Sequence, residues 1–521
     1  MQRVGVGVGA LTEAEVVAVA RDGSGVELTA EALDVIAASR KVVQRLADDP
    51  EPHYGISTGF GALATKHIPP AQRALLQQSL IRSHAAGYGP EVEREVVRAL
   101  MLLRLSTLAT GRTGVRPDTA LALAGMLDNG ITPVVPEYGS LGCSGDLAPL
   151  AHVALALLGE GPVRDPMGTL GQAADVLPAH GITPVRLVEK EGLALINGTD
   201  GMLGQLLLAC HDLDLLLRTA DLSAAMSVEA MLGTDAVFAA DLQELRPQPG
   251  QAVAAANMRA LLADSPIVAS HAGPDCVYVQ DAYSMRCAPQ VAGAARDTLA
   301  HARRTAGFEL AAAVDNPVVV GPLGGAGADE VRVESNGNFH GAPIGYVLDF
   351  LAIPAADVAS MSERRTDRML DVARSRGLPP FLADDPGVDS GHMIAQYTQA
   401  GLVSELKRLA VPASVDSIPS SAMQEDHVSM GWSAARKLRR AVDALGAVLA
   451  IELLTAARAL ELRLPLQPSP ATGSVVAALR NDVPGPGPDR YLAPDMAAAV
   501  EFVRSGAAVA AADSALPAPL R

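Results

Sequence analysis

A glycine-rich octet holds the residues of this chain that are best suited to chemistry. The stretch 139–146 reads Gly-Ser-Leu-Gly-Cys-Ser-Gly-Asp, and its three glycines free the backbone to enter conformations that side chains forbid. Asp146 occupies the position of a helix N-cap, and Pro149 falls in the first turn of the apolar stretch 147–158. The pattern predicts a tight loop at the start of a helix, where amide N–H groups and the helix dipole favour negative charge.

The octet resembles the signature of the histidine and phenylalanine ammonia-lyase family. In that family an Ala-Ser-Gly tripeptide condenses into a 4-methylidene-imidazol-5-one ring (MIO), an electrophile made from the backbone. The resemblance implies that Cys143, Ser144 and Gly145 form this ring here without an external cofactor. The Gly145 nitrogen attacks the Cys143 carbonyl, and loss of water from Ser144 leaves the methylidene group. The Cys143 side chain takes no part in these bonds, so its departure from alanine is expected to be tolerated.

Six further segments match the same family between residues 54 and 427. By residue type alone, Tyr54 could be an ordinary half-buried aromatic and His84 a satisfied helix residue. The resemblance implies instead that Tyr54 removes the β-proton of the substrate and that Ser83-His84 contacts its aromatic ring. Asn197, in Asn-Gly-Thr, is implied to hydrogen-bond the imidazolone.

The segment Gln280-Asp-Ala-Tyr283-Ser-Met-Arg286 places three polar side chains at helical spacing, so one helix face can present all of them. A solvated polar face has the same pattern. The resemblance implies that Tyr283 acts in ring formation or proton handling and that Arg286 binds the substrate carboxylate, with Gln280 in support. A guanidinium suits that role because its fork binds a carboxylate bidentately. Phe339 is implied to pack beside the electrophile.

The last matching segment, Ser421-Ala-Met-Gln-Glu425-Asp-His427, bears on the substrate. Phenylalanine and tyrosine enzymes of the family tend to carry an amide where this chain has Glu425, and a carboxylate suits an imidazole that can donate and carry charge. The resemblance therefore implies a carbon-nitrogen lyase of histidine degradation, which converts L-histidine to trans-urocanate and ammonia. The alternative is a phenylalanine or tyrosine ammonia-lyase, or an aminomutase. Whether Tyr54 or Glu425 is the main base stays open.

Composition excludes several other classes of protein. The 521 residues carry 41 Lys and Arg against 58 Asp and Glu, a net charge of -17, so binding to nucleic acid is not expected. Uninterrupted apolar runs stay below about 18 residues, so we expect no membrane span. Cysteines at 143, 210, 276 and 287 form no CxxC pair, which favours a reducing cytoplasm without disulfides or a metal site.

The elements that must position these residues are expected to be mainly α. Aromatic residues are only 3% of the chain, which favours close-packed helices over sheets. The pattern predicts a short strand over 184–188 and helices over 29–48, 70–86, 91–110, 117–129, 276–304, 341–373, 391–409 and 421–463. We divide the chain into an N-terminal part with the Cys-Ser-Gly loop (1–220), a central long-helix bundle (221–464) and a C-terminal helical tail (465–521).

The resemblance also implies a homotetramer in which neighbouring chains share each site. One chain would supply Tyr54, His84, the ring, Asn197 and Glu425, and its neighbours would supply Gln280, Tyr283, Arg286 and Phe339. A rival interpretation is a serine or cysteine hydrolase that uses Ser144 or Cys143. It is disfavoured because the run around Ser144 lacks the G-x-S-x-G spacing of a nucleophile elbow and no α/β pattern surrounds it.

Overall fold

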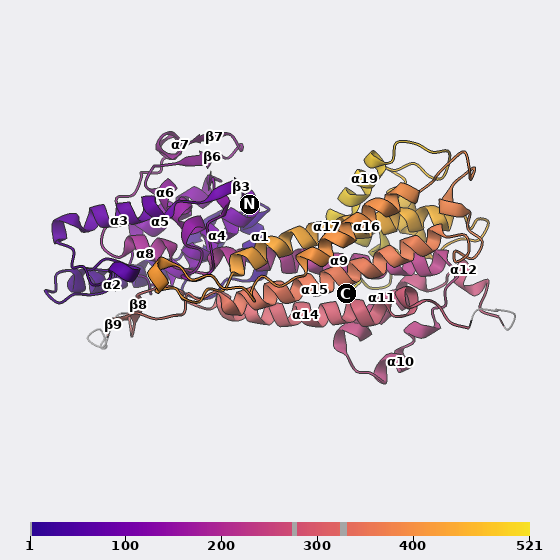
Figure 1. Ribbon diagram of the computed structural model, residues 1–521, viewed down its shortest axis with the longest axis horizontal. Helices are drawn as coiled ribbons and strands as arrows, with labels where there is room; N and C mark the ends of the chain where they lie inside the picture. The colour runs from indigo at the N-terminus through magenta and orange to yellow at the C-terminus, as the bar shows by residue number, and fades with distance from the viewer. Residues whose placement is uncertain (1–2, 274–278, 324–330) are drawn as a thin grey trace. The chain divides into compact units, whose positions relative to one another are not determined.

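The chain is mainly helical, as predicted (Figure 1). The computed structural model describes residues 3–273, 279–323 and 331–521. Cys276 and the first residues of the helix predicted over 276–304 lie outside the described residues. The described residues divide into two compact units, each assembled from separate stretches of sequence. The first unit comprises Met1–Leu208, Arg303–Leu348 and Ala413–Arg436, and the second comprises Ala209–Ala302, Asp349–Pro412 and Lys437–Arg521.

The three-part division predicted from sequence, with boundaries near 220 and 464, stays a prediction. It follows the order of the chain, whereas each compact unit gathers stretches that are distant in sequence. Four long helices contribute residues to both units: α9 (Asp200–Ala230), α14 (Ala288–Leu310), α15 (Ala342–Leu370) and α17 (Gly431–Glu461).

Among its described residues the first unit contains eight further α-helices, many of which begin where the sequence supplies a start signal. Thr12 and Glu15 form a complete capping box on α1, the Thr29 hydroxyl caps α2, and Pro117 opens α5. These helices are α1 (Glu13–Ala20), α2 (Ala30–Ala47), α3 (Pro70–His84), α4 (Arg94–Ala109), α5 (Pro117–Asp128), α6 (Leu147–Leu157), α7 (Ala173–Ala179) and α8 (Glu191–Ile196). The described residues of this unit also contain the 3₁₀ turns η1 (Gly61–Leu63) and η5 (Ser421–Met423).

The strands of the first unit are short and form four small sheets. β1 (Val4–Val6) pairs in parallel with β2 (Val26–Leu28), with Val4 opposite Val26. The other pairings are antiparallel: β3 (Tyr88–Glu91) with β5 (Pro136–Tyr138), β6 (Pro162–Arg164) with both β4 (Thr132–Pro133) and β7 (Leu170–Gln172), and β8 (Val318–Val320) with β9 (Arg332–Glu334).

In its described residues, the second unit consists of helices and their connections. Besides its shares of the four long helices, it contains α10 (Ala240–Glu244), α11 (Pro249–Leu262), α12 (Pro266–Ala269), α13 (Tyr283–Arg286), α16 (Met393–Leu409), α18 (Pro470–Leu479), α19 (Ala493–Arg504), α20 (Ala507–Asp513) and the 3₁₀ turns η2 (Ala236–Phe238) and η4 (Pro380–Leu382). Its interior includes a buried ion pair in which Arg365 donates to Glu452, which also accepts from the hydroxyls of Ser223 and Ser227.

Three predictions of secondary structure are wrong. The helix predicted over 276–304 does not include residues 279–282 and is interrupted at Cys287, so Gln280 precedes α13 and does not share a helix face with Tyr283 and Arg286. Residues 184–188 are not a strand: the Val185 N–H donates to the Leu157 carbonyl, and the neighbouring β6 and β7 pair with each other instead. The helix predicted from residue 421 begins at Gly431. Residues 421–423 form a 3₁₀ turn with positive φ angles, so the backbone before α17 is irregular.

Two stretches, Glu191–Ala230 and Ala342–Leu370, are long and apolar enough to cross a membrane by composition. The apolar window of the first is completely buried within the chain and that of the second is 61% buried, and core helices pass the same test. The expectation that the chain has no membrane span stays a prediction.

Candidate active site

The octet folds into the tight loop that its glycines predict. Gly142 and Gly145 both have φ in the left-handed region, at 66° and 75°. The loop is packed against Gly198: the Asp146 N–H donates to the Gly198 carbonyl at 2.7 Å. A Cβ atom on Gly145 would collide with the Gly198 peptide, so this position has no room for a side chain. The Gly142 carbonyl accepts from the Ser429 hydroxyl at 2.7 Å, which fixes the other end of the loop.

Asp146 stands at the N-cap position of α6, but its side chain does not cap that helix. Its carboxyl instead accepts hydrogen bonds from the Ser140 hydroxyl and from the Met202 N–H in the first turn of α9, both at 2.9 Å. Burial raises the pKa of the Asp146 carboxyl to about 7, although these hydrogen bonds act in the opposite direction. The residue therefore links the octet to the start of α9 rather than to its own helix.

Glu425 lies beside the tripeptide that the resemblance singles out. One carboxylate oxygen accepts from the Ser144 hydroxyl at 3.1 Å, and the other accepts from the Ser420 hydroxyl at 3.0 Å. The Cys143 thiol also points at this carboxylate, with Sγ 3.5 Å from Oε2. Burial and the negative charge of Glu425 together raise the pKa of the Cys143 thiol to about 11. The thiol is therefore a neutral donor near pH 7.

A cavity of about 760 Å³ opens in front of this group, and residues of the first unit line it. Its lining brings together Tyr54, His84, Ser144, Asn197 and Glu425 from five separate stretches of sequence. The Tyr54 hydroxyl accepts from the Gly61 N–H at 3.3 Å, which leaves its O–H free to donate. A mostly apolar cavity with a few convergent polar groups is the usual form of a small-molecule site.

His84 ends α3 at the wall of this cavity. Its Nδ1 lies 2.9 Å from the Leu80 carbonyl and 3.1 Å from the Ser83 hydroxyl. Burial lowers the pKa of the imidazole, while the Leu80 carbonyl and the negative charge of Glu425 oppose that shift. The bond to the Leu80 carbonyl places a proton on Nδ1, so Nε2 is the nitrogen available to accept.

Asn197 follows the last residue of α8, and its amide is only partly satisfied. Nδ2 donates to the Asn316 carbonyl at 3.3 Å, and Oδ1 is buried without a hydrogen-bond partner among the described residues. Asn316 and Ser420 thus orient two predicted site residues, although sequence reasoning missed both. Ser420 lies one residue before the matching segment 421–427, and no spacing in the sequence distinguishes either residue.

The remaining predicted residues are not part of this cavity wall. Gln280, Tyr283 and Arg286 belong to the second unit, in and just before the short helix α13. Tyr283 is 69% exposed, and the Arg286 guanidinium lies 4.7 Å from the centre of its ring. Phe339 belongs to the first unit and is half-buried, but the described lining of the cavity does not include it.

Comparisons with known proteins agree on one family. The sequence matches the family described as aromatic amino acid lyase over residues 11–481. It is 64% identical to the histidine ammonia-lyase of Streptomyces avermitilis over 515 residues, which is 99% of each chain. It is also 64% identical to the histidine ammonia-lyase of Streptomyces coelicolor over 522 residues, the full length of both chains.

Solved structures with the same fold include enzymes with different activities. The tyrosine aminomutase of Streptomyces globisporus superimposes with a TM-score of 0.92 at 38% identity, and the match covers 100% of both chains. The histidine ammonia-lyase of Trypanosoma cruzi superimposes with a TM-score of 0.90 at 37% identity, over 99% of this chain and 96% of that one. The fold is therefore shared by ammonia-lyases and an aminomutase.

Proposed function

Because this chain belongs to the aromatic amino acid lyase family, we propose that it eliminates ammonia from L-histidine to give trans-urocanate. The observation that carries this proposal is the Glu425 carboxylate, 3.1 Å from Ser144 on the wall of a cavity that His84 also lines. A carboxylate and an imidazole can both pair with the ring nitrogens of histidine, whereas a phenyl ring offers them no partner. Two full-length relatives at 64% identity are named histidine ammonia-lyase, which supports the same substrate.

The tripeptide and its surroundings fit the MIO ring. Gly145 has a positive φ and packs against Gly198, where a side chain would not fit. Because glycine has no side chain, nothing on Gly145 itself obstructs its nitrogen. The buried Asn197 Oδ1, which lacks a partner among the described residues, belongs to a side chain of the same cavity. The Cys143 thiol stays protonated near pH 7, so it adds no charge beside the loop. Formed from Cys143, Ser144 and Gly145, the ring supplies an electrophile for the substrate amine, which makes that amine a better leaving group.

The chain's own residues then have distinct roles in the proposal. Tyr54 and Glu425 both line the cavity and are the two candidate bases for the β-proton. Glu425 is also held by the Ser420 hydroxyl, so its carboxylate keeps one orientation while it pairs with the imidazole of the substrate. His84 accepts from the same imidazole through Nε2. An elimination of this kind depends on holding the amine, the β-proton and the base in fixed geometry.

We extend the proposal to the assembly. The cavity of the first unit offers no arginine among its described lining residues to bind the carboxylate of an amino acid. Arg286 fits that role because its Nε is buried without a hydrogen-bond partner among the described residues, and the exposed Tyr283 lies beside it. We place these residues at the site of a neighbouring chain in a cytoplasmic homotetramer. Light scattering that finds a fully active monomer contradicts this assembly.

The substrate is tested by direct assay. Purified protein is incubated with L-histidine, L-phenylalanine and L-tyrosine in parallel, and ammonia and the unsaturated acid are measured for each. We expect urocanate absorbance and an equal amount of ammonia from histidine, with little product from the other two. Cinnamate or coumarate in the absence of urocanate overturns the assignment.

An aminomutase is the second candidate, because the tyrosine aminomutase of Streptomyces globisporus shares the fold at a TM-score of 0.92. Such an enzyme returns the ammonia to the β-carbon. Chromatography of the same reactions for a β-amino acid separates the two activities. Release of ammonia equal to the substrate consumed supports the lyase.

A further inference from the structure

The Gly198 peptide is the wall against which the octet is pressed. The Asp146 N–H donates to the Gly198 carbonyl at 2.7 Å, and a Cβ atom on Gly145 would meet the oxygen, carbon and nitrogen of Gly198. Gly198 therefore sets how closely the backbone at Gly145 is packed. The residues that hold Gly198 control how tightly the tripeptide is folded.

Arg104, on α4, holds this wall from the opposite side. Its guanidinium donates to the carbonyls of Ala194 and Asn197 at 3.0 and 3.1 Å and to the Asp200 carboxylate at 2.6 Å. Arg104 is only 1% exposed, and a Cβ atom on Gly198 would collide with it. Gly198 is thus enclosed between the octet and a buried cation, which leaves no room for a side chain on either face.

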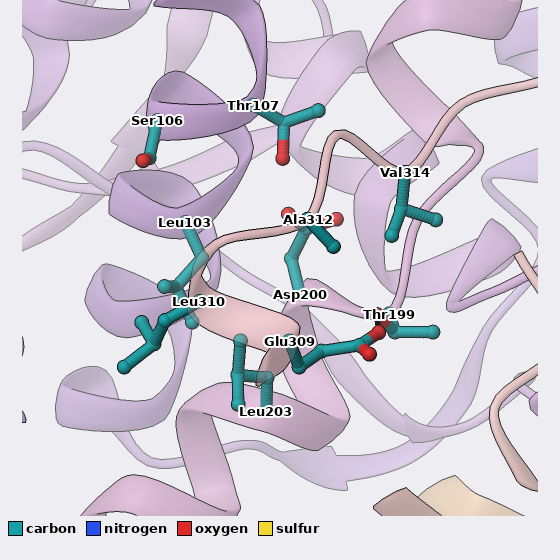
Figure 2. A pocket seen from close by; sticks show the side chains of 10 residues that line it. All are labelled: Leu103, Ser106, Thr107, Thr199, Asp200, Leu203, Glu309, Leu310, Ala312 and Val314. Carbon is teal, nitrogen blue, oxygen red and sulfur yellow. Dashed lines mark hydrogen bonds between the residues drawn. The ribbon is translucent and has the colours of Figure 1, made fainter. Parts of the chain in front are cut away.

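A second carboxyl group lies beside this pair, and its contacts indicate a positioning role. Figure 2 shows Glu309, from the last turn of α14, pointing toward Thr199, the residue between Gly198 and Asp200. The Thr199 hydroxyl donates to Glu309 Oε1. Burial raises the pKa of Glu309, and the negative charge of Asp200 adds to the shift. Arg104 already pairs with Asp200, so the bond to Thr199 is what ties Glu309 to the 197–200 turn.

The surroundings of Glu309 make this bond hard to replace. Thr199 is 3% exposed, and the adjoining cavity holds only about 20 Å³, which is room for a single water. Ser106 and Thr107 of α4 line this cavity on the side opposite Thr199 and Glu309 (Figure 2). The small cavity therefore leaves little room for solvent to substitute for the Thr199 hydroxyl, whose loss leaves the half-buried Glu309 carboxyl group without this donor.

We propose that the bond between Thr199 and Glu309 is a positioning device for formation of the backbone ring. The inference rests on the proposed function, because it concerns the cyclisation of Cys143, Ser144 and Gly145. In that reaction the Gly145 nitrogen bonds to the Cys143 carbonyl carbon, and the carbonyl oxygen leaves as one water with the amide hydrogens of Gly145 and Ser144. The Ser144 nitrogen becomes doubly bonded to the former carbonyl carbon. Ser144 loses its hydroxyl group and Cα hydrogen as a second water. Thr199 and Glu309 act before turnover, by holding Gly198 where it compresses Gly145.

A matched pair of variants tests this role. Thr119, also in the first unit, is 0% exposed and donates through its hydroxyl to the buried Glu191 at 2.7 Å. Thr199→Val and Thr119→Val therefore each remove a hydrogen bond from a threonine hydroxyl to a glutamate. The first bond lies next to the residues that contact the octet, and the second does not. For each variant, intact mass gives the fraction of chains that have lost two waters, and circular dichroism gives the melting temperature.

We expect Thr119→Val to lose two waters as completely as the wild type. Thr199→Val should retain them in most chains, although its melting temperature should be similar to that of Thr119→Val. Glu309→Gln should cyclise like the wild type because an amide oxygen still accepts from Thr199, whereas Glu309→Leu should resemble Thr199→Val. Complete cyclisation of Thr199→Val overturns the inference. Equal loss of cyclisation in Thr119→Val also overturns it, because the effect then follows stability alone. A wild type that retains both waters refutes the ring itself, and with it the proposed function.

Discussion

The two groups of predicted site residues have opposite surroundings. In the first unit, Ser144, Glu425, His84 and Asn197 converge on one cavity and are held by hydrogen bonds to neighbouring groups. In the second unit, Gln280 and Tyr283 are exposed, and Arg286 contacts the ring of Tyr283. The same family resemblance predicted both groups.

This difference shows what a single chain can and cannot build. A network of buried donors and acceptors fixes side chains within one folded unit, because unsatisfied polar groups are costly there. An exposed tyrosine beside a partly unsatisfied arginine has no such constraint in its own unit. We therefore expect variants of Ser144 and Glu425 in the first group to affect the chemistry, and variants of Arg286 in the second group to affect binding.

The largest effect is expected for Ser144→Ala, within the first group. Without the hydroxyl group there is no second dehydration and no electrophile, so kcat/KM should fall by about a thousandfold or more. Intact mass should show that the chain retains the corresponding water, and circular dichroism should show the wild-type helical content. Activity near that of the wild type would contradict the role of Ser144 and would favour a different nucleophile or electrophile.

Glu425→Gln should reduce kcat for histidine by about a hundredfold, because an amide can neither accept a proton nor match the charge of an imidazole. Asp426→Asn is the matched control, since Asp426 is the adjacent acidic residue and its side chain is exposed. Steady-state kinetics of the two variants should distinguish the effect of the carboxylate that lines the cavity from that of the exposed carboxylate next to it in sequence. Equal losses in both would mean that local charge, and not the carboxylate at Ser144, controls the rate.

Arg286→Lys should act mainly on binding. The loss of the planar fork removes one charge-assisted hydrogen bond, worth about 1.5–3 kcal/mol, so KM should rise by about tenfold or more with a smaller change in kcat. Initial rates over a range of histidine concentrations measure this split. A fall in kcat with unchanged KM would instead place Arg286 among the groups that act in the chemical step.

Coexpression of Ser144→Ala with Arg286→Ala sharpens the same comparison. If neighbouring chains share each site, some sites of a mixed assembly contain both native residues, and activity should exceed that of either variant alone. Each chain carries a different tag, and purification through both tags in succession yields the mixed complexes. Mixed complexes that are no more active than the single variants would show that each chain uses its own Arg286.

The smallest effect on activity is expected at Asp146, where the prediction concerns the pH dependence of stability. The pKa of this carboxyl is raised to about 7 in the folded chain, from an ordinary value of 3.8, so the folded state binds more protons between these values. Stability contributed by the protonated form is therefore complete below about pH 4 and is lost as the pH rises to about 7. Relative to Asp146→Asn, the wild type should lose up to a few kcal/mol of unfolding free energy over this range. Urea unfolding at several pH values measures the difference, and parallel curves for the two proteins would contradict it.

Local sequence predicted those elements whose signals are contiguous. The helix predicted over 29–48 begins at its Thr29 cap, because a cap acts within one turn. The segment 421–430 shows where this reasoning fails: Ala, Met, Gln and Glu favour helix, yet the backbone there is irregular. Hydrogen bonds from Ser420 to Glu425 and from Ser429 to the Gly142 carbonyl hold it in place of a helix. Tertiary contacts therefore overrode helix propensity at the segment that carries Glu425.

The sequence by itself determined which chemical groups the site could contain, because the reactivity of Cys143-Ser144-Gly145 and the charge of Glu425 belong to residue types and short spacings. It also determined most helices through periodicity and caps. Only the tertiary structure decided that Asp146 bonds to the start of α9 instead of capping its own helix, and that Gly145 packs against Gly198 with no room for a side chain. These contacts join residues about fifty positions apart in the chain, and no local pattern records which distant backbone will supply the partner for a buried polar group.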